Sequence, residues 1–431
     1  MDTRTGLPVV GMVGGGQLAR MTHQAAIALG QSLRVLSESP DDSAALVAAD
    51  VRIGTHTDLA ALREFAKGCD AVTFDHEHVP TGHIAVLAAE GVKIYPGADA
   101  IRYAQDKRQM RERLTALGAP VPRWRPVTSA EDIIAFAASG PTGSDAGAVA
   151  SEHAAGSSKG AAGSSEHASE ASVQAAGSSE RAAGAAPGGG WPVVAKAVRG
   201  GYDGRGVWML DGPDAAAELV ATGTELIVEE RVPLRRELAA LVARSPFGQV
   251  AAYPVVETVQ RDGICVEVLA PAPGLSEALA VEAQQLAIDL ANALGVVGLL
   301  AVELFETASG IVVNELAMRP HNSGHWTIEG ARTSQFEQHL RAVLDYPMGE
   351  TTLTAPAVVM ANVLGGEPGG MSIDERLHHL FAADPGARVH LYGKQVRPGR
   401  KIGHVTVLGD DMTAVRARAA RAARWLQEGK E

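Results

Sequence analysis

Two glutamates in the second half of the chain are spaced so that both carboxylates could bind one divalent cation. The sequence LLAVELFE-TASG-IVVNELA reads as a β-hairpin, and a register that pairs Phe305 with Val313 also pairs Glu303 with Glu315. Like charges at paired hairpin positions are destabilising. A shared Mg²⁺ would offset the repulsion, with the Asn314 side chain as a further oxygen ligand. A protonated carboxylate or a shifted register is the alternative.

A strand lysine followed by a glycine-rich loop indicates a place for phosphate chemistry. Lys196 lies in the apolar run VVAKAV, where strand alternation directs its side chain to one face. The sequence GGYDGRG follows, with four glycines in seven residues, so its N–H groups could fold over phosphates. This is not a Walker P-loop, because the lysine precedes the glycines. A glycine-rich hairpin without a ligand is the alternative.

The N-terminal glycines allow a third site. Gly14, Gly15 and Gly16 directly follow an apolar strand pattern and open a helical one, and Glu38 follows the next strand, as in dinucleotide-binding units. N–H groups at a helix N-terminus suit many phosphates. The pattern therefore favours a phosphorylated ligand, while a dinucleotide and a purely structural turn remain alternatives.

Two further polar runs could contribute to a site. The run RPHNSGHW begins at Arg319, directly after the glutamate hairpin, and concentrates Arg, His, Asn and Ser beside the expected metal ligands. The run KQVRPGRK, from Lys394 to Lys401, places four cations in eight residues of a chain whose formal net charge is −12. Its Pro–Gly pair stiffens the backbone, which favours a shaped anion site over a solvated basic loop.

Alternating patterns of strands and helices predict three regions that position these residues. Residues 1–101 alternate short apolar strands with amphipathic helices, which predicts an α/β domain with a doubly wound parallel sheet. The predicted strands are 8–13, 33–37, 71–75 and 92–97. Residues 102–346 carry the lysine strand, several β-rich runs, a helix at 276–294 and the glutamate hairpin. Residues 347–431 hold further strands and a closing helix from Met412, so we expect a small β-rich C-terminal domain in an overall α/β and α+β fold.

The stretch 139–190 interrupts the second region as a low-complexity insertion. Between Gly140 and Gly190 its only large apolar residues are Val149 and Val173, and AAGSS recurs three times. Such a segment buries too little apolar surface to offset its ordering entropy, so we predict disorder. A regulatory or partner-binding segment is the alternative.

Composition excludes several classes of function. Hydrophobic residues make up 46% of the 431 residues, enough for several cores, and 50 acidic against 38 basic residues argue against nucleic-acid binding. Two cysteines, Cys69 and Cys265, cannot form a disulfide framework or a multi-cysteine zinc site, which favours a reducing compartment. No apolar run reaches the length of a membrane span, and no secretory signal is visible. We expect a soluble cytoplasmic protein that binds no membrane.

Taken together, the motifs resemble the ATP-grasp superfamily. The strand lysine, the glycine-rich flap, the ELIVEE run and the two-glutamate hairpin carry this likeness. The strings GGGQLARM, GGYDGRG, NELAMRPHNSGHWT and VRPGRKIGH are similar to one family within it, the 5-(carboxyamino)imidazole ribonucleotide synthases of purine biosynthesis. The resemblance implies a ligase that uses ATP, Mg²⁺ and bicarbonate to carboxylate 5-aminoimidazole ribonucleotide through carboxyphosphate, releasing ADP and phosphate. It also implies a homodimer.

The resemblance assigns roles to matching residues of this chain. The ATP-binding residues would be Lys107, Lys196, Gly201, Tyr202, Asp203, Gly204, Arg205, Gly206, Val207, Glu229, Glu230, Arg231, Val232, Glu237, Gln260, Asn314 and Glu315. The substrate-binding residues would be Gly14, Gly16, Gln17, Asp75, Arg319, His321, Asn322, Ser323 and His325. The metal ligands would be Glu303, Asn314 and Glu315, and the catalytic residues Glu77, Lys394, Arg400 and Lys401.

Two positions depart from the family pattern, and two other functions remain as alternatives. Gln260 stands where histidine is common, and Asp75 where glutamate is usual. The N-terminal glycines and Glu38 also fit a dinucleotide-dependent oxidoreductase, which leaves the glutamate hairpin and the flap without a role. A non-catalytic nucleotide sensor with a repeat-bearing interaction segment would bind ATP without turnover.

Overall fold

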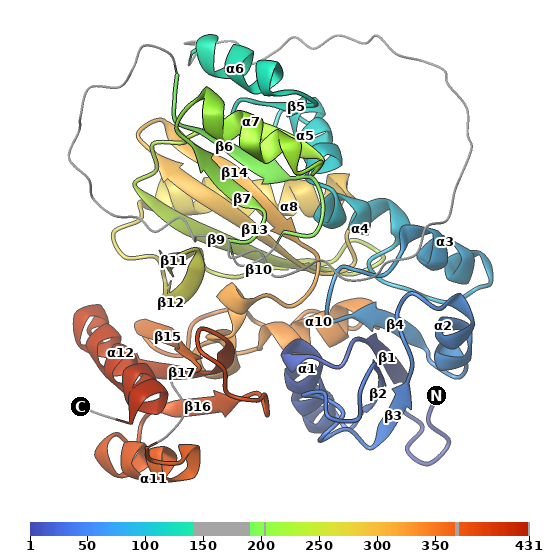
Figure 1. The fold of residues 1–431 in the computed structure, drawn as a ribbon. Coiled ribbons are helices and arrows are strands. Elements are labelled where there is room, and N and C mark those ends of the chain that lie inside the picture. The colour runs from blue at the N-terminus through green and yellow to red at the C-terminus, as the bar shows by residue number, and fades with distance from the viewer. Residues whose placement is uncertain (141–189, 202–203, 367–369, 430–431) are drawn as a thin grey trace. The chain divides into compact units, whose positions relative to one another are not determined.

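The computed structural model describes residues 1–140, 190–201, 204–366 and 370–429 (Figure 1). These residues form two units, of which the first combines residues 1–122 with 232–431 and the second comprises residues 123–231. The predicted disorder of the insertion concerns residues 141–189, which lie outside the described ranges. None of the described helices is long and apolar enough to cross a membrane.

The first unit begins with a parallel sheet, which confirms the prediction from alternating strands and helices. In the described part of the chain this sheet has four strands in the order β3-β2-β1-β4, and all neighbours run parallel. The elements are β1 (Val9–Val13), α1 (Gln17–Ala28), β2 (Ser32–Ser37), β3 (Asp50–Ile53), α2 (Leu59–Ala66), β4 (Ala71–Phe74) and α3 (Thr81–Ala89). β1 and β4 are buried along their whole length, as is usual for a parallel sheet covered on both faces.

Two features of this sheet differ from the prediction. The apolar run at 92–97 forms a single parallel bridge between Ile94 and Val72 instead of a strand. Tyr95 still donates its N–H to the Val72 carbonyl, but Pro96 after it has no N–H to continue a ladder. Strand β3 has no counterpart in the prediction, because it is short and two of its four residues are exposed at the sheet edge.

An antiparallel sheet makes up most of the remaining first unit. Among the described residues it has nine strands in the order β14-β13-β9-β11-β12-β15-β17-β16, with β10 beside β9. Their bounds are β9 (Arg236–Arg244), β10 (Val250–Ala252), β11 (Val256–Arg261), β12 (Ile264–Ala270), β13 (Gly298–Thr307), β14 (Gly310–Ala317), β15 (Ala357–Leu364), β16 (Arg388–Leu391) and β17 (Lys401–Gly409). Because β12 pairs with β15, strands on both sides of the domain boundary expected at 346/347 share one sheet. That boundary stays a prediction.

Helices cover this sheet and bury its apolar faces. α8 (Glu277–Ala293) packs on β9 and β13, and Met110 and Leu114 of α5 (Lys107–Ala116) join the same core. α12 (Met412–Glu428) packs on β15 and β17, beside α11 (Ile373–Ala383) (Figure 1). The other helical segments of this unit are α4 (Ala98–Gln105), η1 (Asn322–Gly324), α9 (Thr327–Gly330) and α10 (Gln335–Val343).

The described residues of the second unit form a smaller antiparallel sheet covered by two helices. Its described strands follow the order β5-β8-β6-β7. The elements are β5 (Trp124–Val127), α6 (Ala130–Ala138), β6 (Val193–Ala197), β7 (Val207–Leu210), α7 (Pro213–Ala221) and β8 (Leu226–Glu230). Ile133, Phe136 and Leu219 of the two helices lie in its core. Lys196 lies in β6, which confirms the strand predicted for it.

Candidate functional site

The glutamate hairpin has the predicted pair of carboxylates but a different register around it. Glu303 of β13 faces Glu315 of β14, as predicted. The predicted pairing of Phe305 with Val313 is wrong, since Val313 pairs with Leu304 instead. The register shifts by one residue directly after Glu303, so that Asn314 is the extra residue of a β-bulge. The strict alternation of apolar and polar residues used to predict the hairpin does not reveal a bulge. Bulges commonly redirect side chains beside functional sites.

Cationic and neutral groups surround the two carboxylates. The Lys107 ammonium, at the start of α5, forms a salt bridge with the Glu315 carboxylate. His321 Nε2 lies 3.5 Å from Glu303 Oε1, and Asn314 Nδ2 donates to Glu303 Oε2 at 3.4 Å. Burial, and then the charges of Arg319 and Lys401, lower the pKa of His321 to about 3, so the imidazole is neutral at physiological pH. Lys107 therefore provides part of the charge compensation that the sequence assigned to a metal.

The hairpin suits Mg²⁺ that is held jointly with a nucleotide. Among the described residues, no group of three or more His, Cys, Asp or Glu side chains is arranged to hold a metal ion. Glu303, Glu315 and Asn314 supply two carboxylates and one amide oxygen. Mg²⁺ commonly takes one or two protein carboxylates and completes its shell with water and substrate phosphates. The donor set therefore fits Mg²⁺ better than a resident zinc ion.

In the second unit, the predicted phosphate lysine is held by a buried carboxylate. Lys196 Nζ lies 2.8 Å from Glu229 Oε2, and the two side chains are 10% and 3% exposed. They reach each other diagonally between the paired strands β6 and β8. Glu230, the next residue, accepts from the Arg123 backbone N–H at 2.9 Å. The pair keeps the ammonium in a fixed place on the sheet.

Other predicted ATP-binding residues are divided between the two units. In the second unit, Gly204 and Gly206 have φ angles of +76° and +72°, which glycine adopts without strain. Glu237 and Gln260 lie half-buried in β9 and β11 of the first unit. Arg231 is exposed and Val232 half-buried, whereas Tyr202 and Asp203 lie outside the described residues. The assignment of all these residues to ATP stays a prediction.

The N-terminal glycine turn is filled by a carboxylate of the same chain. Asp75, buried at the end of β4, accepts from the Gly16 N–H at 2.5 Å, and the Gly14 N–H donates to the Leu36 carbonyl at 2.9 Å. A Cβ at Gly14, whose φ is +109°, would lie 1.6 Å from Asp75 Oδ1. These two N–H groups are thus not available to a phosphate, contrary to the expectation for this turn. Burial raises the pKa of Asp75 to about 6.

Residues assigned to catalysis meet residues assigned to substrate binding at two long-range contacts. Glu77 Oε2 accepts from Arg319 Nε at 3.2 Å, and its Oε1 accepts from the Met318 N–H at 2.7 Å. The Lys394 ammonium donates to the side-chain oxygen of Gln17. The contact joins the start of α1 to a loop 377 residues later. The charges of Arg319 and Lys394 both act on the buried Asp75 carboxyl, so the first unit brings these predicted residues into one region.

The cationic loop is only partly directed at this region. Lys394 and Lys401 are half-buried, whereas Arg397 and Arg400 are exposed. Arg397 donates to the Gln395 side chain at 2.8 Å, and Arg400 Nη1 donates to the Gln395 carbonyl at 3.4 Å. The two lysines therefore belong to the buried side of the loop and the two arginines to its solvent side.

The polar run after the hairpin is held by a buried glutamine. The Gln335 side chain accepts from the His321 N–H at 2.9 Å and donates to the His321 carbonyl at 2.8 Å. Its amide nitrogen also lies 3.0 Å from His325 Nδ1. Ser323 Oγ lies 2.8 Å from His321 Nδ1. His325 is fully buried beneath the run, so its assigned contact with substrate stays a prediction.

Three residues that support the site were missed in the sequence. Gln335 holds the polar run, and Asn362 of β15 exchanges two side-chain hydrogen bonds with Asn322, at 3.0 and 2.8 Å. Arg111 of α5 is fully buried and donates to carbonyls of the glutamate hairpin. No local pattern identifies these residues, because their partners are distant in sequence. A fully buried arginine in an amphipathic helix shows its role only once the fold is known.

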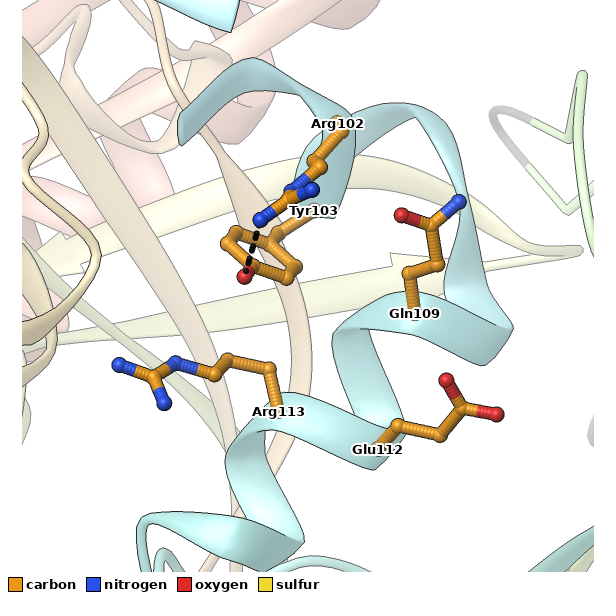
Figure 2. Close-up of a pocket in the computed structure, with 5 residues that line it drawn as sticks. All are labelled: Arg102, Tyr103, Gln109, Glu112 and Arg113. Carbon is orange, nitrogen blue, oxygen red and sulfur yellow. Dashed lines mark hydrogen bonds between the residues drawn. The ribbon is translucent and has the colours of Figure 1, made fainter. Parts of the chain in front are cut away.

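A surface cavity lies outside the predicted site. It has a volume of about 340 Å³ and is lined by Arg102, Tyr103, Gln109, Glu112 and Arg113. Figure 2 shows these side chains on α4 and α5, with a hydrogen bond from Arg102 to the Tyr103 hydroxyl at 3.1 Å. None of the predicted site residues lines this cavity. The candidate site therefore rests on the contacts described above.

Comparison with protein families divides the chain among three models. Residues 7–105 match the ribonucleotide synthetase preATP-grasp domain, and residues 165–336 match the ATP-grasp domain. Residues 358–418 match the phosphoribosylaminoimidazole carboxylase C-terminal domain. The three matches occur in the order of the three regions predicted from the sequence.

Relatives along the full length agree with these models. The N5-carboxyaminoimidazole ribonucleotide synthase of Mycobacterium tuberculosis is 56% identical over 98% of this chain and 89% of its own length. The synthase of Corynebacterium ammoniagenes is 44% identical over 98% and 92%. The crystal structure of the Thermus thermophilus synthetase superposes with a TM-score of 0.77 at 35% identity, covering 96% of this chain and 98% of that one. An Aspergillus clavatus synthase with ADP and 5-aminoimidazole ribonucleotide has a TM-score of 0.76 at 30% identity, with 97% and 98% coverage.

Proposed function

Because the chain belongs to the N5-carboxyaminoimidazole ribonucleotide synthase family of ATP-grasp enzymes, we propose that it carboxylates the amino group of 5-aminoimidazole ribonucleotide. ATP and bicarbonate are consumed, and ADP and phosphate are released. The observation that carries the proposal is the convergence in the first unit of Lys107 with Glu315, Glu77 with Arg319, and Lys394 with Gln17. The two residues of each pair are more than 200 positions apart in the sequence.

Bicarbonate is activated by phosphoryl transfer from ATP, and the charged residues of the candidate site favour this step. Phosphoryl transfer depends mainly on positioning and charge neutralisation. Lys107, which forms a salt bridge with Glu315 in the first unit, supplies positive charge for the ATP phosphates. Mg²⁺, when bound with the nucleotide, would neutralise phosphate charge, held by Glu303, Asn314 and Glu315. The carboxyphosphate formed hydrolyses readily, so the residues around it must exclude water.

The glycine turn indicates how the ribonucleotide is oriented. A carboxylate at the start of α1 repels a phosphate, so the ligand group nearest Asp75 must be a hydrogen-bond donor, such as a hydroxyl or the amine. The phosphate then belongs with the cationic loop from Lys394 to Lys401. The amine forms the new carbon–nitrogen bond as phosphate leaves, and it gives up one proton. Asp75, whose pKa is raised to about 6, can hold that proton near neutral pH.

The same turn argues against a dinucleotide-dependent oxidoreductase. A dinucleotide requires its pyrophosphate to approach the glycine turn closely, yet Asp75 occupies that approach. Glu38, which would bind a ribose in that reading, accepts from Thr55 Oγ1 and lies 3.0 Å from His56 Nδ1. Both features that favoured the alternative therefore have other partners.

The proposal is tested by direct quantification of ADP. Purified protein is incubated with ATP, Mg²⁺ and ¹³C-bicarbonate, with and without 5-aminoimidazole ribonucleotide. We expect ribonucleotide-stimulated ADP release together with a ¹³C carbamate signal. Any of three results would refute the proposed reaction: ADP release that the ribonucleotide does not stimulate, binding of ATP without turnover, or oxidation of NADH. Omission of bicarbonate serves as the control.

Three finer properties form part of the same proposal. Mg²⁺ is the metal that the oxygen donors of the hairpin favour. The cytoplasm is the compartment, which the two free cysteines support. The assembly is a homodimer, as the resemblance implies. Light scattering after size exclusion measures the mass directly, and a monomer at micromolar concentration would contradict the last point.

A further inference from the structure

The bulge in the glutamate hairpin is what brings three donor side chains together. In a regular strand, Asn314 and Glu315 would point to opposite faces of the sheet. Here Glu315 faces Glu303 across the hairpin, while the extra residue Asn314 also reaches Glu303, with its amide nitrogen 3.4 Å from Oε2. The proposed metal and ATP ligands therefore depend on an irregularity of β14.

That irregularity lies on β14, the edge strand of the sheet that the described residues form. β14 ends the strand order of the described sheet, so its outer backbone groups need other partners. The Val313 N–H donates to the Pro120 carbonyl at 2.7 Å. Arg111 Nη1 donates to the Val313 carbonyl at 3.3 Å, and Nη2 donates to the Asn314 carbonyl at 2.7 Å. One guanidinium thus binds both carbonyls at the bulge.

The geometry of α5 matches this arrangement. Lys107 and Arg111 are four residues apart and so lie on one face of the helix, about 6 Å apart along its axis. Val313 and Glu315 are two residues apart on the strand, about 6.6 Å in extended geometry. Lys107 binds the Glu315 side chain, and Arg111 binds the two carbonyls at the bulge. The lysine can therefore exchange Glu315 for a phosphate without releasing the bulge.

We infer that Arg111 is a positioning residue for the metal- and triphosphate-binding end of the hairpin. It acts by holding the backbone carbonyls of Val313 and Asn314. The inference rests on the proposed function. A planar guanidinium with two parallel donors suits two adjacent carbonyls, which an ammonium cannot match. Arg111 is fully buried, so a merely structural role must be separated from positioning by the experiment.

The test compares Arg111→Met and Arg111→Lys with Arg113→Met. Arg113 is the matched control because it lies on the same helix and donates to a carbonyl, that of Ala293 at 3.2 Å, away from the hairpin. Calorimetry measures the binding of Mg²⁺ with a non-hydrolysable ATP analogue, and thermal unfolding measures stability. Steady-state kinetics give KM for ATP and for 5-aminoimidazole ribonucleotide.

We expect Arg111→Met to weaken binding of the Mg²⁺–nucleotide complex at least tenfold and to raise KM for ATP, with KM for the ribonucleotide changed less than twofold. Arg111→Lys should recover the melting temperature more fully than the nucleotide affinity. Arg113→Met should bind the complex like the wild type. If Arg111→Met does not fold, Arg111→Lys decides the same comparison.

Two results overturn the inference. One is unchanged Mg²⁺–nucleotide affinity in a folded Arg111 variant. The other is an equal rise of both KM values, which indicates general destabilisation. The proposed function is judged separately on the wild-type protein, which must bind the complex and release ADP. Failure there rejects both, whereas a normal wild type with insensitive Arg111 variants rejects positioning alone.

Discussion

Replacing Asp75 with asparagine is expected to stabilise the protein above pH 6 while weakening ribonucleotide binding. The Asp75 carboxyl is buried against the glycine turn, and burial raises its pKa from 3.8 to about 6. Asparagine keeps an oxygen that can accept from the Gly16 N–H, but it carries no charge to desolvate. The ionised Asp75 carboxylate therefore lowers the free energy of unfolding above pH 6, and we expect this residue to be retained for ribonucleotide binding.

The magnitude follows from the two pKa values. Below about pH 3.8 the carboxyl is protonated in both the folded and the unfolded chain, so it contributes no pH dependence. Between about pH 4 and 6 the unfolded chain releases the proton while the folded protein keeps it, so the free energy of unfolding falls as pH rises. Each pKa unit corresponds to about 1.36 kcal/mol. The difference of about two units gives a loss of at most about 3 kcal/mol above pH 6.

The assay is urea unfolding of both proteins at pH 4.5 and pH 8. Asp75→Asn should gain up to about 3 kcal/mol over wild type at pH 8 and much less at pH 4.5, while its KM for the ribonucleotide rises. Asp384→Asn is the control of opposite sign, since hydrogen bonding to Arg418 lowers the pKa of Asp384 and the variant should lose stability at pH 8. An Asp75→Asn protein less stable than wild type at pH 8 would refute the reasoning.

Three other outcomes follow from the described contacts. Glu315→Gln should reduce turnover at least 100-fold with little change in melting temperature. The change in stability is small because the lost salt bridge is partly exposed and contributes at most about 1 kcal/mol. Normal turnover would reject the metal assignment. Replacing residues 142–189 by a short Gly-Ser linker should leave the melting temperature and kcat nearly unchanged. The two ends are adjacent, since an ideal Cβ on Gly190 would lie 3.4 Å from the Gly140 Cα, and the entropy of closing a loop depends little on its length. A loss of several degrees would show that the segment packs on the fold. Arg400→Ala should raise KM for the ribonucleotide about tenfold or more, which is the loss expected for a charge-assisted contact, and it should leave KM for ATP unchanged. Equal changes in the two KM values would assign the loop to general electrostatic steering.

Most elements of the fold could be predicted, because their side-chain periodicity is local. The strand that carries Lys196, the helix after Ser276 and the closing helix from Met412 all occur where the pattern places them. The pattern did not predict the short edge strand β3, and it predicted a strand at 92–97 where the structure has a single bridge at Ile94. In both cases the outcome depends on which strand lies alongside, which local patterns do not contain.

The site shows the same division more sharply. Spacing alone predicted that Glu303 faces Glu315, but it misplaced Val313 because a bulge depends on backbone hydrogen bonds made at the sheet edge. The contact of Gln17 with Lys394 spans 377 residues. It could be anticipated only from resemblance to a known family, because no physical rule of spacing reaches so far along a chain.

The sequence by itself determined which chemistry is present: carboxylates and an amide oxygen for a divalent cation, lysines for phosphates, and a glycine turn at the start of α1. Only the tertiary structure decided how those groups are used. It placed the Asp75 carboxyl against the turn, where it accepts from the Gly16 N–H and lies close to Gly14. It also placed Arg111 beneath the bulge. Both results come from packing of distant segments, where burial and backbone hydrogen bonding set the charge and direction of each group.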